Sequence, residues 1–336
     1  MIEIKNLEKV FHIKAKFSDK KTVHAVRKVN LIIPDGGAIS LIGESGCGKT
    51  TIGRMLCGLE KPTAGSIIIN GQDISKLRRG ARSKLLQKIQ LIQQDPYQAL
   101  NPTHTIYQMM SATLKKVAKE KKKGRDWVRW RMDELLNLVG LDPSTILFKY
   151  PHMLSGGQRQ RVIIARALTV EPEILVADEI VSMIDVSLRL GILKLLRNLR
   201  EQFNISILFI THDVASARYL GENTKLYVVY KGMIIERGHT ERVIRQPRHP
   251  YTQALLSAMP ILKGIERAGS DRFVLTSQFR QSVQEPAGCL FADRCPFSQP
   301  VCRDKRPELT AEGEGASACF FPKVRKVAAV AVNQGV

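Results

Sequence analysis

The feature that most constrains the fold is a glycine-rich stretch that connects a buried strand to a helix. The strand is GAISLIG (residues 37–43), whose continuous apolar residues are typical of a strand covered on both faces. The stretch GESGCGKT (43–50) follows it, and a helix is predicted from Lys49 through Leu59. This order of strand, glycine turn and helix favours an α/β fold.

The alternation of strand and helix returns in the second half of the chain. The strand-like stretches EILVAD (173–178) and ISILFI (205–210) flank a long helix that is predicted over residues 188–203. Strands that alternate with helices predict an α/β fold with a mainly parallel sheet in three layers. Between the two halves, residues 96–165 are mostly helical and basic, and we expect them to form an inserted helical subdomain.

A change of composition near residue 256 predicts a domain boundary. Before it, TKLYVVYKGMIIERG (224–238) has the pattern of a β-hairpin with Lys231 and Gly232 at its turn. The part after the boundary is rich in loops and holds four of the six cysteines. We therefore expect a domain over residues 1–255 and a small extension over residues 256–336.

The net charge of +21 has three interpretations: nucleic-acid binding, attraction to an anionic membrane surface, or a generally basic surface. In the densest basic run, KKVAKEKKKGRDWVRWR (115–131), two tryptophans could stack on bases, or Trp127 and Trp130 could share one apolar edge of a solvated helix. No signal peptide and no apolar run long enough to span a bilayer is recognised. We expect a cytosolic protein, or one peripheral on the cytosolic face of a membrane.

The stretch GESGCGKT fits the pattern G-x-x-x-x-G-K-[ST], which requires a strand before it and a helix after it. Its glycines let backbone N–H groups surround phosphate oxygens, and the helix N-terminus adds positive potential. Lys49 can reach the β- and γ-phosphates, and the Thr50 hydroxyl can hold Mg²⁺. The candidate nucleotide-binding residues are Gly43, Glu44, Ser45, Gly46, Cys47, Gly48, Lys49, Thr50 and Thr51, although Cys47 is expected mainly to pack.

Two adjacent carboxylates, Asp178 and Glu179, end the apolar strand EILVAD. Two acids at one strand end are costly unless a cation or a water molecule uses them. We assign Asp178 to Mg²⁺ and Glu179 to the attacking water, as the base that orients or deprotonates it. The alternative is a solvated pair at the start of a loop.

A second candidate anion site lies in LSGGQRQR (154–161). Ser155, Gly156 and Gly157 precede a predicted helix and offer a hydroxyl and backbone amides at its N-terminus. Taken alone, the stretch is better explained as an ordinary capped helix start. The residues by themselves do not indicate how two phosphate-binding ends so far apart in sequence would meet.

Together these motifs resemble the ATP-binding cassette (ABC) ATPases, and the likeness covers about residues 1–255. The six family motifs occur in the family's order: Walker A (GESGCGKT), the Q-loop (LIQQDP, with Gln94), the signature (LSGGQRQR), Walker B (ILVADE), the D-loop (SMID, with Asp185) and the switch histidine (FITHD, with His212). The resemblance implies a three-layer P-loop NTPase cassette that hydrolyses ATP.

The resemblance also implies roles for residues that the pattern alone does not assign. Two cassettes would face each other head to tail, so that the signature residues of one close on the ATP of the other; these are Ser155, Gly156, Gly157 and Gln158. His212 would contact the γ-phosphate, and Gln94 would join the Mg²⁺ shell and link it to a membrane-embedded partner. An aromatic side chain would stack on adenine; our candidate is Phe11, with His24 as the weaker one.

A narrower likeness points to the oligopeptide/dipeptide branch of ABC importers, which also includes importers of nickel and of oligosaccharides. It is carried by QQDPYQALNP (93–102), HPYTQALLSAMP (249–260) and the cysteine-containing end of the chain. In that branch four such cysteines imply a [4Fe–4S] cluster, here with Cys289, Cys295, Cys302 and Cys319 as ligands. The alternatives are zinc and no metal at all, and the close cysteine pairs of zinc ribbons are absent from the sequence.

The branch implies partners as well: a second ABC ATPase in a heterodimer, two transmembrane permease subunits and an extracytoplasmic solute-binding protein. Where the family usually has Pro-Thr after the glutamate, this chain has Ile180 and Val181, and its D-loop contains Met183 and Ile184. Because these residues are apolar, we expect them to pack without removing a catalytic group. The alternative function is a soluble ABC ATPase that acts on ribosomes or nucleic acid, which the basic charge favours.

Overall fold

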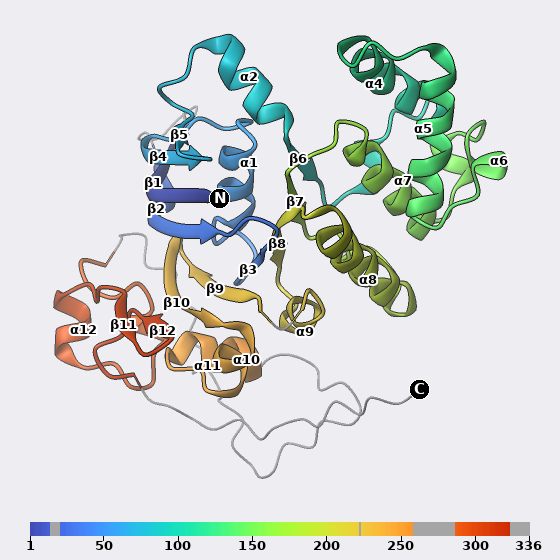
Figure 1. Cartoon of the computed structure of the whole chain (residues 1–336). Coiled ribbons are helices and arrows are strands. Elements are labelled where there is room, and N and C mark those ends of the chain that lie inside the picture. The colour runs from blue at the N-terminus through green and yellow to red at the C-terminus, as the bar shows by residue number, and fades with distance from the viewer. Residues whose placement is uncertain (14–20, 222, 258–285, 323–336) are drawn as a thin grey trace.

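Two sheets organise the part of the chain that the computed structural model describes, residues 1–13, 21–221, 223–257 and 286–322 (Figure 1). The smaller sheet is antiparallel, in the order β2-β1-β4-β5, and the larger one has the order β11-β12-β10-β9-β3-β8-β7-β6. The strands are β1 (Ile2–Ile13), β2 (Lys21–Ile33), β3 (Ala38–Ile42), β4 (Ala64–Ile69), β5 (Gln72–Asp73), β6 (Ile89–Ile92), β7 (Ile174–Asp178), β8 (Ser206–Thr211), β9 (Lys225–Tyr230), β10 (Met233–His239), β11 (Thr310–Glu312) and β12 (Gly315–Ser317).

Helices cover both faces of the larger sheet and form a separate group at one side of the molecule. Figure 1 shows α4, α5 and α6, in green, on the side away from β1, β2, β4 and β5. The α-helices are α1 (Lys49–Leu56), α2 (Arg79–Gln87), α3 (Pro96–Ala99), α4 (Ile106–Glu120), α5 (Arg125–Leu138), α6 (Pro143–Ile146), α7 (Gly156–Leu168), α8 (Val186–Phe203), α9 (Val214–Arg218), α10 (Thr240–Arg245), α11 (Pro250–Ser257) and α12 (Pro300–Asp304). Short 3₁₀ turns are η1 (Pro151–Met153) and η2 (Ala292–Arg294).

The centre of the larger sheet is parallel, as the alternation of strands and helices predicts. Strands β6, β7, β8, β3 and β9 pair in parallel, whereas β10, β12 and β11 add antiparallel pairs at one end. The predicted hairpin joins β9 to β10, and its turn has positive φ at Lys231 (43°) and Gly232 (82°). Two positive φ values are the geometry of a type I′ turn, which matches the twist of the strands that it connects.

Alternating side chains on β7 and β8 divide the interior into two hydrophobic clusters. On β8, Ile207 and Phe209 belong to the cluster that includes the inner face of α8, while Leu208 and Ile210 belong to the one that includes α1 and the smaller sheet. Because successive side chains of a strand point to opposite faces, one strand serves both layers. This arrangement explains why the strand sequences are apolar throughout.

Helix α1 ends three residues before the predicted end at Leu59. Gly58 has φ of 70°, its N–H donates to the Met55 carbonyl over 3.0 Å, and the Leu59 N–H donates to the Arg54 carbonyl over 2.9 Å. These two bonds form a Schellman motif, which closes a helix with a left-handed glycine.

The basic run at residues 115–131 occupies two helices instead of one. Helix α4 ends at Glu120 and α5 begins at Arg125, with a turn between them in which Lys122 has φ of 55°. Trp127 packs against the hydrophobic cluster of the helical region, whereas Trp130 is 56 % exposed. The expectation that both tryptophans share one apolar edge is therefore wrong for Trp130.

The described part of the C-terminal extension continues the larger sheet. Strand β12 pairs with β10, with Glu236 opposite Ser317, and Figure 1 shows β11, β12 and α12 in orange and red beside β10. Residues 258–285 and 323–336, which belong to the predicted extension, lie outside the described residues. The division at residue 255 therefore stays a prediction.

Among the described helices, none combines the length and the apolar character that crossing a membrane requires.

Because β8 contributes side chains to both hydrophobic clusters, we expect the fold to be most sensitive to substitutions in this strand. Phe209 is fully buried on β8, so Phe209→Ala should lower the free energy of unfolding by about 3–5 kcal/mol, because it leaves a cavity beneath α8. Phe203 on α8 is 49 % exposed, and Phe203→Ala is the matched control, expected to cost less than about 1 kcal/mol. Guanidinium unfolding of both variants measures the difference; equal losses would contradict this view of the core.

Candidate functional site

The predicted glycine loop leaves the end of β3 and leads directly into α1. Gly48 has φ of 104°, and a Cβ atom there would lie 2.2 Å from the Ala25 carbonyl oxygen of β2, so only glycine fits. Lys49 is 4 % exposed, and its ammonium donates to the carbonyls of Gly43 (2.8 Å) and Glu44 (2.9 Å). The loop thus curves around a buried cation at a helix N-terminus, an arrangement that attracts anions.

A cavity of about 590 Å³ opens beside this loop and collects most of the predicted nucleotide site. Its lining residues come from β2, the glycine loop, α1, the segment after β6, the end of β7, the β9–β10 turn and the C-terminal extension. They are Thr22, Val23, His24, Ala25, Arg27, Ser45, Gly46, Gly48, Lys49, Thr50, Thr51, Gln94, Glu179, Lys231, Gly232, Pro286 and Leu290. Gly43, Glu44 and Cys47 complete the same loop without lining the cavity.

Two of the three predicted Mg²⁺ ligands, Thr50 and Asp178, contact each other, and the third, Gln94, lines the cavity. The Thr50 hydroxyl donates to Asp178 Oδ1 over 3.1 Å. Burial raises the pKa of Asp178, the bond from Thr50 opposes that rise, and the neighbouring charge of Glu179 adds to it. A hydroxyl and a carboxylate oxygen are ligands that Mg²⁺ accepts. A cation here would relieve the burial cost of the Asp178 charge.

The predicted base and the switch histidine contact each other at the ends of neighbouring strands. His212 Nδ1 lies 3.3 Å from Glu179 Oε2, and the parallel register of β7 and β8 places Asp178 opposite Ile210. Glu179 has φ of 49°, a left-handed conformation that costs a non-glycine residue energy. Its N–H donates to the Ile210 carbonyl over 2.8 Å, which holds it there. This strained backbone aims a carboxylate at the cavity.

Three of the four residues that depart from the family pattern pack as expected, and the expectation is wrong for Met183. Ile180 and Val181 are at most 2 % exposed and join the hydrophobic cluster beneath α8, as does Ile184. Met183 is 56 % exposed, and Asp185 is exposed at the start of α8. The substitutions therefore leave both carboxylates in place and present an apolar side chain to the outside of the D-loop.

The two candidates for adenine stacking lie in different places. His24 lines the cavity, whereas Phe11 does not; the Phe11 ring is half-buried under the Lys9 ammonium, 4.7 Å from its centroid. In the β1–β2 register Phe11 pairs with Val23, and His24 pairs with Val10. The position of the cavity favours His24 over Phe11.

The signature residues begin α7 away from the nucleotide cavity of their own chain. The Ser155 hydroxyl accepts a bond from the Gln158 N–H (3.3 Å), and the Gln158 side chain accepts one from the Ser155 N–H (3.0 Å), which is a capping box. Ser155, Gly156 and Gly157 do not line the cavity that holds Lys49. Within one chain the two predicted anion sites therefore stay apart.

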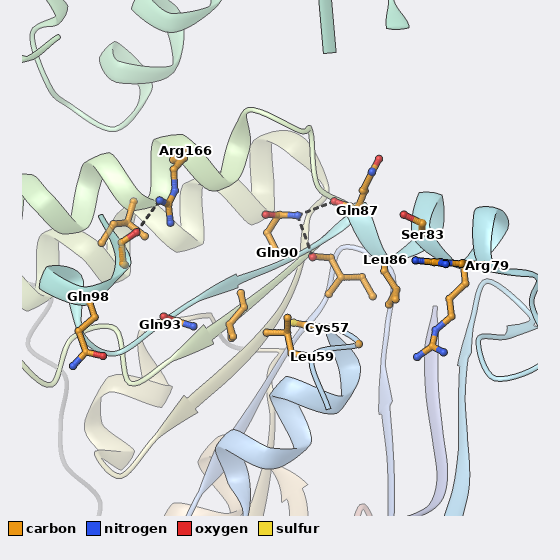
Figure 2. A pocket seen from close by; sticks show the side chains of 16 residues that line it. Cys57, Leu59, Arg79, Ser83, Leu86, Gln87, Gln90, Gln93, Gln98 and Arg166 are labelled. Carbon is orange, nitrogen blue, oxygen red and sulfur yellow. Dashed lines mark hydrogen bonds between the residues drawn. The ribbon is translucent and has the colours of Figure 1, made fainter. Parts of the chain in front are cut away.

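A second, larger cavity of about 780 Å³ lies between α2 and α7 (Figure 2). Figure 2 shows Arg79 and Leu86 on one side, Arg166 and Gln93 on the other, and Cys57 between them. The Arg166 guanidinium donates to the Ala99 carbonyl over 2.8 Å. Gln93 lines this cavity, and its neighbour Gln94 lines the nucleotide cavity, so two consecutive residues connect the two spaces.

The four C-terminal cysteines come together although their spacing spans thirty residues of sequence. All four line one small cavity of about 20 Å³ together with His249 and Phe291. Burial raises the pKa of Cys289, Cys295 and Cys319, and the neighbouring cysteines add to that rise. Among the described residues, however, no three His, Cys, Asp or Glu side chains are close enough to hold a single metal ion.

Sequence reasoning missed the contacts that the C-terminal extension makes with the nucleotide site. Pro286 and Leu290 line the nucleotide cavity, and Arg294 forms two bonds with Glu44 of the glycine loop (2.8 and 2.9 Å). These pairs are about 250 residues apart, and no periodicity or motif connects them. The sequence gives no signal for the contact between Arg294 and Glu44, apart from the position of this arginine directly before Cys295.

Comparison with known proteins agrees with a nucleotide-binding site beside the glycine loop. The family described as "ABC transporter" matches residues 26–182, and the one described as "Oligopeptide/dipeptide transporter, C-terminal region" matches residues 235–302. The oligopeptide transport ATP-binding protein AppF of Bacillus subtilis is 38 % identical over 92 % of this chain and 93 % of its own length. This chain belongs to the ATP-binding proteins of the oligopeptide/dipeptide ABC transporter family.

Other relatives give the same result for sequence and fold. The dipeptide transport ATP-binding protein DppF of Escherichia coli is 36 % identical over 95 % of this chain and 94 % of its own. The ATP-binding cassette MJ0796, solved as a dimer in a post-hydrolysis state with ADP and Pi, superposes with a TM-score of 0.60 at 28 % identity. That match covers 71 % of this chain and 99 % of the cassette, so the predicted α/β cassette fold is confirmed.

The contact between Glu179 and His212 leads to a prediction about turnover. Glu179→Gln should lower kcat for ATP hydrolysis by a factor of about 10²–10⁴, since an amide cannot take a proton from water, while ATP affinity stays within about twofold. Steady-state phosphate release and equilibrium binding of a fluorescent ATP analogue separate the two effects.

The control is Glu173→Gln, the same substitution in the residue before β7, where the side chain is half exposed and pairs with Lys88. It should change neither quantity. Normal turnover by the Glu179→Gln protein would show that another group activates the water.

Proposed function

We propose that this chain is the ATP-hydrolysing subunit of a peptide importer and works at the cytosolic face of a membrane, bound peripherally to its permease. The observation that carries the proposal is the cavity beside Lys49, which Thr50 and Glu179 line, while their partners Asp178 and His212 lie at the adjacent ends of β7 and β8. Carboxyl ends of parallel strands are where such folds bind nucleotides. Membership of the oligopeptide/dipeptide family supports the transport role.

The residues in and beside the cavity divide the work of hydrolysis. Lys49 and the loop amides bind the phosphates, and Thr50, Asp178 and Gln94 would hold Mg²⁺, which would neutralise phosphate charge. Glu179 orients and deprotonates the attacking water, and His212, 3.3 Å from it, contacts the γ-phosphate. His24 stacks on adenine from its place on the cavity wall, in preference to Phe11.

A second cassette completes the site. Ser155, Gly156, Gly157 and Gln158 lie outside the cavity of their own chain, so the anion site at the start of α7 needs the ATP of a partner. The solved structure of the cassette MJ0796 is a dimer bound to ADP and Pi. Exposed Met183 and Leu188 flank Asp185, and burying them in that interface would stabilise it. In this branch we expect the partner to be a second, different ABC ATPase.

The cavity in Figure 2 is where we place the permease. It is large and open enough for one turn of helix, and its wall carries the cations Arg79, Arg82 and Arg166. A permease segment that enters it would press on Gln93, and the adjacent Gln94 would carry the displacement to the nucleotide cavity. Two transmembrane permease subunits would each seat one cassette in this way.

The transported solute reaches the permease from an extracytoplasmic binding protein and is a peptide. The names of the relatives support this choice, since AppF is called an oligopeptide and DppF a dipeptide transport protein. Oligosaccharides and nickel, which the wider branch also carries, have no such support. The cassette itself does not contact the solute, so the chain supplies energy and not specificity.

A [4Fe–4S] cluster is our proposal for the four cysteines. The support is in the donor chemistry: four thiols line one cavity, and thiolates are the ligands of such clusters. Zinc ranks below the cluster because the sequence lacks the close cysteine pairs of zinc ribbons. When bound, the cluster would tie η2, α12 and the segment after β12 together through Cys289, Cys295, Cys302 and Cys319.

Action on ribosomes or nucleic acid is the second candidate, and the +21 charge is the observation that favours it. Several cations of the basic helices are already paired: Lys121 with Glu171 (2.5 Å), Arg129 with Asp133 (3.0 Å) and Arg131 with Glu134 (2.5 Å). These pairs reduce the free positive charge of that surface. We therefore rank nucleic acid below the permease as a partner.

The permease proposal predicts a selective loss of partners. Ser83 lines the cavity in Figure 2, so Ser83→Trp should fill it and prevent co-purification of polytopic membrane proteins with the tagged chain. Lys84→Trp on the same helix, at an exposed residue outside the cavity, is the control and should leave the complex intact. Mass spectrometry of mild-detergent pull-downs identifies the partners.

Two outcomes of that pull-down would contradict the proposal. Ribosomal or DNA-processing proteins with the unaltered chain, and no polytopic protein, would support the second candidate. Polytopic partners that stay bound to both tryptophan variants would place the permease on another surface.

The cluster proposal predicts the composition of the purified protein. Protein prepared without air should carry about four iron atoms and about four acid-labile sulfides per chain. Cys302→Ser should lose both, because it removes a thiolate ligand, whereas Cys57→Ser at the end of α1 should keep both. Zinc in place of iron, or iron bound equally by the Cys302→Ser protein, would overturn the assignment.

A further inference from the structure

Arg294 of the C-terminal extension binds the phosphate-binding loop. Both terminal nitrogens of Arg294 donate to the Glu44 carboxylate, over 2.9 Å to Oε2 and 2.8 Å to Oε1. Glu44 is the second residue of GESGCGKT, and Arg294 lies 250 residues later, at the end of η2. A planar guanidinium that meets both carboxylate oxygens fixes the orientation of the group as well as its position.

Glu44 is also held through its backbone. Its N–H donates to the Tyr251 hydroxyl of α11 over 2.8 Å, and its carbonyl accepts a bond from the buried Lys49 ammonium over 2.9 Å. The side chain, the amide and the carbonyl of one loop residue thus each have a defined partner. In a loop with three glycines, which otherwise samples many conformations, such contacts select the one that can surround phosphate.

Arg294 itself rests on a rigid aromatic group. Its guanidinium lies 5.5 Å from the centroid of Phe291 and 5.8 Å from that of Tyr230, within reach of cation–π attraction. Phe291 packs edge-on against Tyr230 (5.4 Å) and Tyr251 (5.5 Å). The next residue after Arg294 is Cys295, which lines the cysteine cavity. The residue that binds the loop therefore belongs to the packed part of the extension.

The charge of Glu44 gives the contact a second effect. A carboxylate in a loop that binds phosphates repels them. The opposing charge of Arg294 cancels this repulsion. Loss of Arg294 would leave a mobile loop that carries an unpaired negative charge.

We propose that Arg294 is a positioning residue for ATP: it fixes the glycine loop through Glu44 and neutralises that carboxylate, so the cysteine-rich extension forms part of the nucleotide site. The inference rests on ATP binding by the cassette and not on the identity of the membrane partners. Arg294 does not touch the reacting atoms, so its effect falls on ATP affinity and not on the chemical step.

The test is a double-mutant cycle in the full-length chain, with a fluorescent ATP analogue for binding and phosphate release for turnover. Arg294→Ala should raise the dissociation constant and the KM for ATP about fivefold and leave kcat unchanged, and Arg294→Lys should raise them about twofold, since one ammonium cannot bridge both oxygens. Arg303→Ala removes an exposed arginine of the same extension and should change nothing.

The background variant Glu44→Gln distinguishes an effect of Arg294 that acts through Glu44 from a general effect of Arg294 on the structure. In that background Arg294→Ala, or Arg294→Lys if the alanine protein does not fold, should have no further effect on ATP affinity. Thermal unfolding of each protein reports stability separately. Unchanged affinity in the single Arg294 variants, an equal loss in Arg303→Ala, or losses that multiply in the double variant would each overturn the proposal.

Discussion

The buried ammonium of Lys49 is the constraint around which the site is arranged. At 4 % exposure it has left most of its water, and the bonds that replace water come from the carbonyls of Gly43 and Glu44. Carbonyl dipoles offset only part of the cost of a buried charge, so the loop remains attractive to a polyanion. The glycines allow the backbone of the loop to curve around the ammonium, and β3 and α1 fix the two ends of the loop.

The parallel register of β3, β8 and β7 converts three distant motifs into one site. Ile42 pairs with Thr211, and Asp178 pairs with Ile210, so the ends of three strands align at one edge. The glycine loop, the acid pair and the switch histidine each follow one of those ends directly. Their distances in space are therefore decided by sheet pairing, which is the most rigid part of the molecule. The strained backbone of Glu179 is tolerable because its N–H is tied to this sheet.

The C-terminal extension belongs to this site more closely than a separate domain would. Strand β12 pairs with β10, Leu290 reaches the nucleotide cavity, and Arg294 meets Glu44 in the glycine loop. The extension also gathers four cysteines in one place next to the aromatic residues that support Arg294. A group bound by those cysteines would act on the nucleotide loop through a short chain of packed side chains. The boundary suggested by composition separates residues that the fold brings together.

The sequence by itself determined the central strands that flank the glycine loop and the acid pair, the glycine loop, the hairpin turn at Lys231 and the order of the motifs, because each depends on residues close together along the chain. It did not determine that the basic run makes two helices, that His24 and not Phe11 lines the cavity, or that Arg294 holds Glu44. Those outcomes depend on which strands pair and on what packs against them, contacts between residues tens to hundreds of positions apart. Local backbone structure can be predicted from short stretches of sequence. Long-range packing has no such local signal, and only the tertiary structure decides it.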